Sequence, residues 1–412
     1  MTGEMTLRRA LVGSFLLGFA AVAQASAGNG IRVGGSSGRL HPYIELEGRY
    51  DSNVAFDQNA NQSSGFILHV RPGLTLDSPG ESVAVKLDAN LDWAQYLGKN
   101  SNLSRLYGEA QLGVGVNRRG TLGLELTDGF RRSSTTHVLS FSGAVVENSN
   151  SLTLAVPWRP GGGAFVTTVS GGWDLSTFEA FDKGLICGDP TLPDCDAGRL
   201  AKLGYSDVRG GLELRWRFLP RTAAVLQGEY WKRLPQDSQL SSKPWGWRVW
   251  AGAAGLMSAH LAGTLKGGWG SISDAPGSIS SWLANAEVEW LPVETASLKL
   301  GYVRDIGVDP GQDFGFTSHR GYLDARALLA SQYTAQITAS YEHRDYPKSN
   351  TLDAADLLVV QPSADIELTR WLRVGAGVAY TKRTSKIPSG GHQFPAFDFD
   401  KTEAFVRLRG TY

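Results

Sequence analysis

Two Ser–His pairs in the sequence are candidates for a nucleophile and its general base. Ser140 lies three residues after His137, and Ser318 directly precedes His319. A hydrolase on an outer wall or at a pore mouth would need such a pair, oriented by a third polar group. Both pairs stand in segments rich in Ser and Thr, where chance explains the adjacency. The chain also has no His-Glu-x-x-His sequence and no phosphate-binding loop. We therefore expect no enzymatic activity and no cofactor.

The only two cysteines, Cys187 and Cys195, lie in one short segment, within a long connection that spans about 180–203. In an oxidising compartment two cysteines this close are expected to form a disulfide that staples the loop. A metal pair is the alternative, but no His lies nearby, so we expect no metal site. The stapled loop would either fold over a pore mouth or protect an exposed surface from proteases.

Charged residues recur at every second position in several segments. The basic candidates for a water-filled lumen are Arg49, Arg209, Arg215, Arg217, Arg373, Arg407 and Arg409. The acidic candidates are Glu213, Glu287, Glu289, Asp365 and Glu367. These side chains either pair across strands or contact a permeating solute. A basic wall suits an anionic solute or an acidic polysaccharide, although the carboxylates weaken that interpretation.

The element that positions such residues is a β-strand with one apolar face. Even positions of 208–218 are apolar or Gly, whereas odd positions include four charged residues; segments 83–93, 284–290 and 404–412 alternate similarly. Soluble sandwiches also alternate. Here, however, the predicted strands are mostly 10 to 15 residues long, and aromatic residues collect at their ends. Both features are typical of strands that cross a membrane.

The connections alternate between tight turns and longer polar loops. Eight short turns, one of them at Leu291-Pro292, and nine long loops make 17 connections and hence 18 strands. The sequence thus predicts a transmembrane, up-and-down antiparallel β-barrel over 41–412, preceded by a short periplasmic segment, 28–40. In such barrels the short turns face the periplasm, and an even number of strands leaves both ends there.

The N-terminal residues predict export from the cytoplasm. Arg8 and Arg9 precede an uncharged stretch, Ala10 to Ala23, and small-x-small cleavage sites follow. We interpret 1–27 as a signal peptide. The 40 Lys plus Arg balance 40 Asp plus Glu, which argues against a nucleic-acid partner. We expect a protein of the outer membrane of a Gram-negative bacterium, in contact with its lipid and lipopolysaccharide.

Several short motifs carry a resemblance to a known family. They are Arg49-Tyr50-Asp51-Ser52-Asn53-Val54, Phe218-Leu219-Pro220, Trp290-Leu291-Pro292, and Thr369-Arg370-Trp371-Leu372 leading into 374–378. With them the chain resembles the outer-membrane β-barrel porins found with exopolysaccharide gene clusters. The last strand, ending at Tyr412, resembles the C-terminal signal that the barrel-assembly machinery binds.

This resemblance implies a role in polysaccharide export. Such barrels are thought to be the outer-membrane conduit of Wzx/Wzy-type pathways, working with a periplasmic polysaccharide-export protein. A diffusion porin for small solutes is the alternative, because its sequence would look nearly identical. A surface adhesin with a blocked lumen is a third possibility, for which longer loops and a more apolar lumen would be expected.

Overall fold

The computed structural model describes residues 28–412 except 34–37, 57–58, 60–61, 136–144, 182–196, 240, 274–277, 310–314, 348, 350–351 and 387–397. The predicted signal peptide, the two cysteines and the pair formed by His137 and Ser140 lie outside the described residues.

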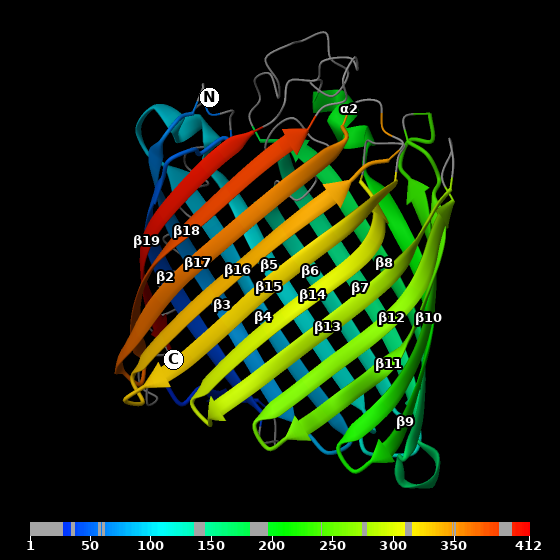
Figure 1. The fold of residues 1–412 in the computed structure, drawn as a ribbon. Coiled ribbons are helices and arrows are strands. Elements are labelled where there is room, and N and C mark those ends of the chain that lie inside the picture. Colours follow the sequence, from blue (N-terminus) through cyan, green and yellow to red (C-terminus); the bar gives the residue numbers. More distant parts are fainter. Residues whose placement is uncertain are drawn as a thin grey trace.

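The described chain forms one closed antiparallel sheet (Figure 1). Of its nineteen strands, the two-residue β1 (Ile31–Arg32) pairs only with the first barrel strand, and the other eighteen form the barrel. These are β2 (Arg39–Asp51), β3 (Gly65–Pro79), β4 (Val83–Tyr96), β5 (Arg105–Val116), β6 (Leu124–Thr135), β7 (Val145–Trp158), β8 (Phe165–Ala180), β9 (Tyr205–Leu219), β10 (Thr222–Pro235), β11 (Trp245–Ser258), β12 (Leu261–Ser273), β13 (Ile279–Val293), β14 (Ala296–Val308), β15 (Gly315–Leu329), β16 (Tyr333–Asp345), β17 (Ala354–Thr369), β18 (Leu372–Lys386) and β19 (Phe399–Thr411). The predicted eighteen-stranded barrel is confirmed.

The barrel closes between its first and last strands. β19 pairs with β2 from Glu403 opposite Asp51 to Thr411 opposite Tyr43. The backbone N–H of Tyr412 also donates to the carbonyl of Pro42, at 3.0 Å. Closure leaves none of the eighteen described barrel strands with an unpaired edge, which a barrel in hydrocarbon requires because lipid offers no hydrogen bonds.

The two ends of the barrel differ in their connections. Short turns and the C-terminus lie at one end, and long connections lie at the other, where Figure 1 also shows α2 (Ala197–Lys202). We assign the turn end to the periplasm and the loop end to the outside. Two short 3-10 helices, Gly98–Leu103 and Pro160–Gly162, complete the structure. No helix among the described residues has the length and apolar character that a membrane crossing requires.

The predicted turn at Leu291-Pro292 lies three residues too early. β13 continues to Val293, and its register with β14 shifts between Trp290 and Val293. Pro292 has no N–H to donate, and such an irregularity near a strand end accommodates it. The chain therefore turns at 294–295. The first barrel strand likewise begins at Arg39 rather than at residue 41.

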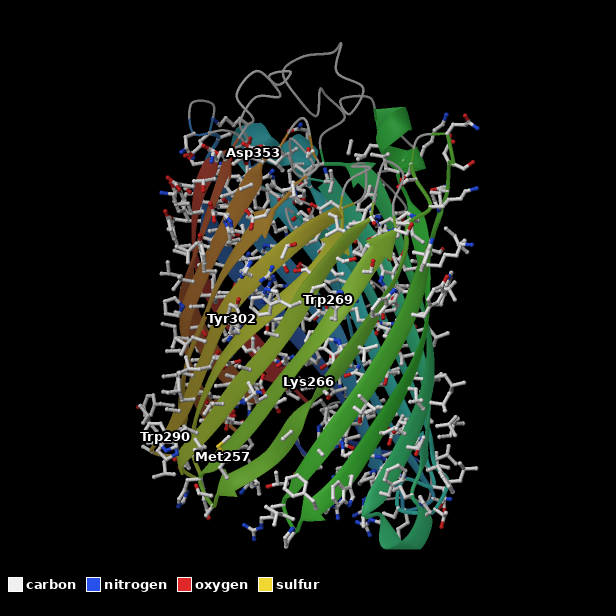
Figure 2. All side chains as sticks on the ribbon, turned by 45° about the vertical axis from the view of Figure 1, so that its right-hand side comes forward. Met257, Lys266, Trp269, Trp290, Tyr302 and Asp353 are labelled. Atoms are coloured by element: carbon white, nitrogen blue, oxygen red, sulfur yellow. The ribbon has the colours of Figure 1, made fainter. Side chains whose placement is uncertain are left out.

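Alternation gives the barrel an apolar outer face. In β9, Val208, Leu212 and Trp216 are exposed in the isolated chain, as residues facing lipid are, whereas the charged residues occupy the positions between them. Figure 2 shows the same surface elsewhere: Trp269 and Tyr302 lie between the two ends of the barrel, and Trp290 and Met257 lie at the turn end.

Burial of the inner face is graded along the barrel axis. In β4 the inward positions change from exposed at Lys86 and Asp88 to fully buried at Ala94, near the extracellular end. Four clusters of buried apolar residues gather near the extracellular strand ends and their loops. The hydrophobic packing of the molecule therefore lies at one end of the lumen.

Aromatic side chains cover two glycines on the inner face. A Cβ added to Gly73 would lie 2.3 Å from the ring of Tyr43, and one added to Gly301 would lie 2.1 Å from the ring of Tyr322. Glycine is therefore required at both positions for a cross-strand ring to lie flat on the sheet.

Candidate functional site: the inner wall of the barrel

The structure places all twelve sequence-predicted lumen residues on the side of the sheet opposite the lipid-facing apolar side chains. Arg209, Glu213, Arg215 and Arg217 alternate in β9 with the exposed Val208, Leu212 and Trp216. Because side chains alternate between the two faces of a strand, the others also lie on the inner face. They are Arg49 in β2, Glu287 and Glu289 in β13, Asp365 and Glu367 in β17, Arg373 in β18, and Arg407 and Arg409 in β19.

Five of the seven predicted arginines are bound to carboxylates. The nitrogen–oxygen distances are 2.6 Å for Arg49–Glu47, 2.9 Å for Arg49–Glu403, 3.1 Å for Arg209–Asp174, 3.0 Å for Arg215–Glu213 and 2.7 Å for Arg407–Asp365, and Arg373 contacts Glu367. Most of the predicted positive charge is thus neutralised on the wall, by neighbours one or two strands away or in the same strand.

The other two arginines have no salt-bridge partner among the described residues. The guanidinium of Arg409 lies 3.7 Å from the ring centre of Tyr43, a cation–π contact that leaves its charge facing the lumen. Arg217 is exposed near the periplasmic end of β9. These two side chains are the predicted residues most available to an anionic solute.

A polar recess lies on the inner wall beside Arg409. It has a volume of about 360 Å³, and its lining includes Tyr43, Glu45, Asp92, Glu109 and Asn90. A smaller recess of about 100 Å³ adjoins it and shares three lining residues: Glu45, Arg407 and Arg409. Together they form a continuous polar track from β17 and β18 across β19 and β2 to β6.

Sequence analysis missed two arginines in this track. Arg71 in β3 contacts three carboxylates, from Glu45 at 2.8 Å, Glu47 at 3.0 Å and Asp92 at 3.0 Å. Arg131 in β6 also lines the larger recess. The polar residues His69, Arg71 and Asp77 occupy alternate positions of β3, which could have identified its inner face. Pro72 and Gly73 interrupt this alternation of polar and apolar residues.

Hydroxyl groups dominate the next sector of the wall. Ser149, Ser151 and Thr153 of β7 face inward, and so do Thr168 and Ser170 of β8, which lie nearer the periplasmic end. A single nitrogen of Arg209, Nη2, lies 3.2 Å from the hydroxyl of Ser151 and 3.0 Å from that of Thr153. This sector offers neutral donors and acceptors without net charge.

The two predicted glutamates of β13 lie toward the periplasmic mouth. Glu287 accepts a hydrogen bond from the hydroxyl of Tyr322 and lies 3.7 Å from Nζ of Lys299. With Glu289, Arg221 and Thr264 it lines a recess of about 280 Å³.

At the extracellular end, residues 305–309 at the end of β14, which we call the β14 strap, lean toward the lumen. Arg248 of β11 donates from Nη2 to the carbonyl of Ile306, at 2.6 Å, and its Nε lies 3.0 Å from the carboxylate of Asp305. β12 and β13 separate these strands in the sheet, so the strap crosses their inner side. Ile306 and Val308 of the strap belong to one buried cluster with Trp231, Trp250, Ile272, Ile279 and Leu283.

Two further anchors hold the strap. Arg233 of β10 donates to the carbonyl of Val308 at 3.0 Å and to both carboxylate oxygens of Asp207 at 2.9 Å. On the other side, Asp309 accepts from Arg344 at 2.8 Å and from the hydroxyl of Tyr346 at 2.5 Å. Burial and the carboxylate of Asp309 raise the pKa of Tyr346, so its hydroxyl keeps the donated proton.

The structure separates the side chains of the predicted pair Ser318 and His319. Alternation turns Ser318 toward the lumen and the adjacent His319 outward, where its Nδ1 lies 2.9 Å from the hydroxyl of Tyr302. Within the described residues, no three His, Cys, Asp or Glu side chains are grouped as a metal site requires.

Comparison with known proteins shows which family the chain is similar to. The sequence profile of a family described as "Putative beta-barrel porin 2" matches residues 207–412, which are 206 of the 412 residues. No protein with a curated description matches the chain.

Among solved structures, the chain is similar to the outer membrane protein OpdK of Pseudomonas aeruginosa, with 14% identity, 90% of this chain and 99% of that chain covered, and a TM-score of 0.44. It is also similar to the siderophore receptor PirA of the same organism (9%, 92% and 81%, 0.44). A third similar structure is the FrpB iron transporter of Neisseria meningitidis (9%, 90% and 81%, 0.42).

Proposed function

Because this chain belongs to that beta-barrel porin family and forms a closed barrel of the Gram-negative outer membrane, we propose that it is a channel whose cargo is a secreted polysaccharide. The observation that carries this proposal is the chemistry of the inner wall. Its charges are mostly held in ion pairs, and hydroxyl groups fill the sector of β7 and β8.

A wall of paired charges suits a polyhydroxylated chain. Each pair still presents free lone pairs and N–H groups to sugar hydroxyls, but its field decays quickly because the charges cancel. A polymer can therefore exchange one set of weak hydrogen bonds for the next as it moves, without being held at one site.

Export would require partners on the periplasmic side. A passive barrel supplies no energy, so the polymer would be driven from the inner membrane and delivered by a periplasmic polysaccharide-export protein. The inner face supports delivery from this side, since its exposed charges, including Arg215 and Arg217, lie toward the periplasmic mouth. Insertion by the barrel-assembly machinery through the strand ending at Tyr412 belongs to the same proposal.

A diffusion porin for small solutes is the second candidate. The family description favours it, and so do Arg217 and Arg409, which have no salt-bridge partner among the described residues and would attract anions. A wall built for an anionic metabolite would place such free cations along the path.

The test is a deletion strain beside a complemented strain, with cell-surface polysaccharide measured by quantitative dye binding and uptake of small anions measured in parallel. Loss of one polymer that complementation restores is the expected result. Unchanged polymer with slower anion uptake would overturn the export proposal and support the porin.

A further inference from the structure

The outer face of β6, β7 and β8 carries polar side chains where the rest of the barrel wall is apolar. Among the described strand residues, the other outward charges lie within four residues of an extracellular strand end; they are Arg132, Glu179, Lys232, Arg304, His319, His343, Asp345, Asp356, Lys382, Lys386 and Asp400. Asp128 is different: it lies seven positions before the extracellular end of β6, and its cross-strand neighbour Leu152 lies six positions before the periplasmic end of β7, although the periplasmic end of β6 itself is four positions away.

Asp128 faces outward with Asn150 of the neighbouring strand. The amide Nδ2 of Asn150 donates to Oδ1 of Asp128 at 3.0 Å. Leu124 and Phe130, at even positions of the same strand, are exposed on the outer face, and Leu154 is exposed on β7. In hydrocarbon the second carboxylate oxygen and the second amide proton would have no hydrogen-bond partner among the described residues, and an ionisable residue at this depth is costly.

An apolar groove adjoins this polar pair. It has a volume of about 450 Å³ on the outer wall, and its lining includes Pro72, Ala89, Gly108, Ala110 and Phe130. Phe130 lies two residues from Asp128, so the groove and the pair form one surface. Small residues at the surface of a membrane segment allow another protein wall to approach closely.

We propose that this surface, formed by the outer faces of β3 to β7, binds a second copy of this chain. The polar pair is self-complementary, because each copy offers one free carboxylate oxygen and one free amide proton. A two-fold contact lets Asn150 of each copy donate to Asp128 of the other, while the apolar grooves pack around them. An acyl chain has neither donor nor acceptor and leaves both groups unsatisfied.

The first test is thiol cross-linking in intact outer membranes. Leu152→Cys, on the outer face of β7, is placed in a chain whose Cys187 and Cys195 are replaced by Ser, and membranes are treated with a short bis-maleimide. The matched control is Ala286→Cys, on the outer face of β13. A product of twice the chain mass from Leu152→Cys and not from Ala286→Cys is the expected result.

Three results would overturn the proposal. They are no product from Leu152→Cys, equal products from both variants, which indicates random collision, and a product whose mass shows a different protein. A heat-dependent mobility shift in electrophoresis confirms that each variant forms a folded barrel before its result is counted.

The second test separates a protein contact from a lipid contact. In Asp128→Leu/Asn150→Leu the cross-link yield should fall about sevenfold, as the loss of two hydrogen bonds between membrane segments predicts. Asp128→Asn keeps a donor and an acceptor and should retain the yield. If the pair faces lipid instead, the double variant would leave the yield unchanged, and that result rejects the proposed contact.

Discussion

The extracellular and periplasmic halves of the inner wall carry the same types of charged residue in different surroundings. Near the outside, Arg233 is 8% exposed, and its partner Asp207 is 20% exposed. Toward the periplasm, Arg215 is 51% exposed, and its partner Glu213 is 29% exposed. The pair Arg233–Asp207 thus lies in the packed extracellular end of the barrel, whereas the pair Arg215–Glu213 is exposed to water in the lumen.

This difference in exposure means that ion pairs in the two halves of the inner wall contribute differently to the stability of the barrel. An exposed pair is screened by solvent and contributes roughly 0–1 kcal/mol. A buried pair also gives little net stability, but removing one partner leaves an uncompensated charge and costs about 3–5 kcal/mol. The extracellular half is therefore expected to set the stability of the fold, and the periplasmic half to set the properties of the solution in the lumen.

The largest expected effect is that of Arg233→Ala. This change leaves the carboxylate of Asp207 and the carbonyl of Val308 without their donor at a buried site. We expect the free energy of unfolding to fall by about 3 kcal/mol. Urea unfolding in lipid vesicles, followed by tryptophan fluorescence, measures it.

The matched control for this change is Arg215→Ala, which removes a pair of the same type at the other end. Its expected effect is below about 1 kcal/mol. Equal losses in the two variants would contradict the division between the halves.

The sequence predicted the barrel, its strand number and the inward position of twelve side chains, because alternation is a local property of each strand. It did not predict which arginines are neutralised. Arg407 is two residues from Arg409 in the same strand, yet only Arg407 reaches a carboxylate, because Asp365 lies two strands away and the register brings them together. The strap was missed for the same reason, since Arg248 and Ile306 are 58 residues apart.

A smaller effect is expected for Arg409→Glu. The free cation becomes an anion beside Tyr43, on the wall of the lumen. Two unit changes of charge about 7 Å from a passing ion, in water and screened by salt, predict that the anion-to-cation permeability ratio falls by up to about tenfold. Reversal potentials in planar bilayers under a salt gradient measure this ratio.

Arg407→Glu is the comparison for the selectivity experiment. It places two carboxylates together and should change stability as well, since Asp365 loses its partner. If Arg409→Glu leaves the permeability ratio unchanged, this part of the wall does not line the conducting path.

The strap predicts a change in conductance instead of selectivity. Arg248→Ala removes the donor to Ile306 and the contact with Asp305. The strap should then move away from the inner side of β12 and β13, and single-channel conductance should rise by about twofold. Lys299→Ala, whose weaker contact with Glu287 lies toward the periplasm, should leave the conductance unchanged. A rise in both variants would show that the strap is not what narrows this end.

The smallest effect is expected at the pair formed by Arg373 and Glu367, where both side chains are nearly half exposed. Arg373→Ala should change the free energy of unfolding by less than about 1 kcal/mol, and raising the salt concentration should reduce even that difference, because solvent screens both charges. The measurement is the urea series used for Arg233→Ala, repeated at low and high salt. A large loss that persists at high salt would show that the periplasmic half also carries stability, and the contrast between the two halves would then be one of solvent exposure alone.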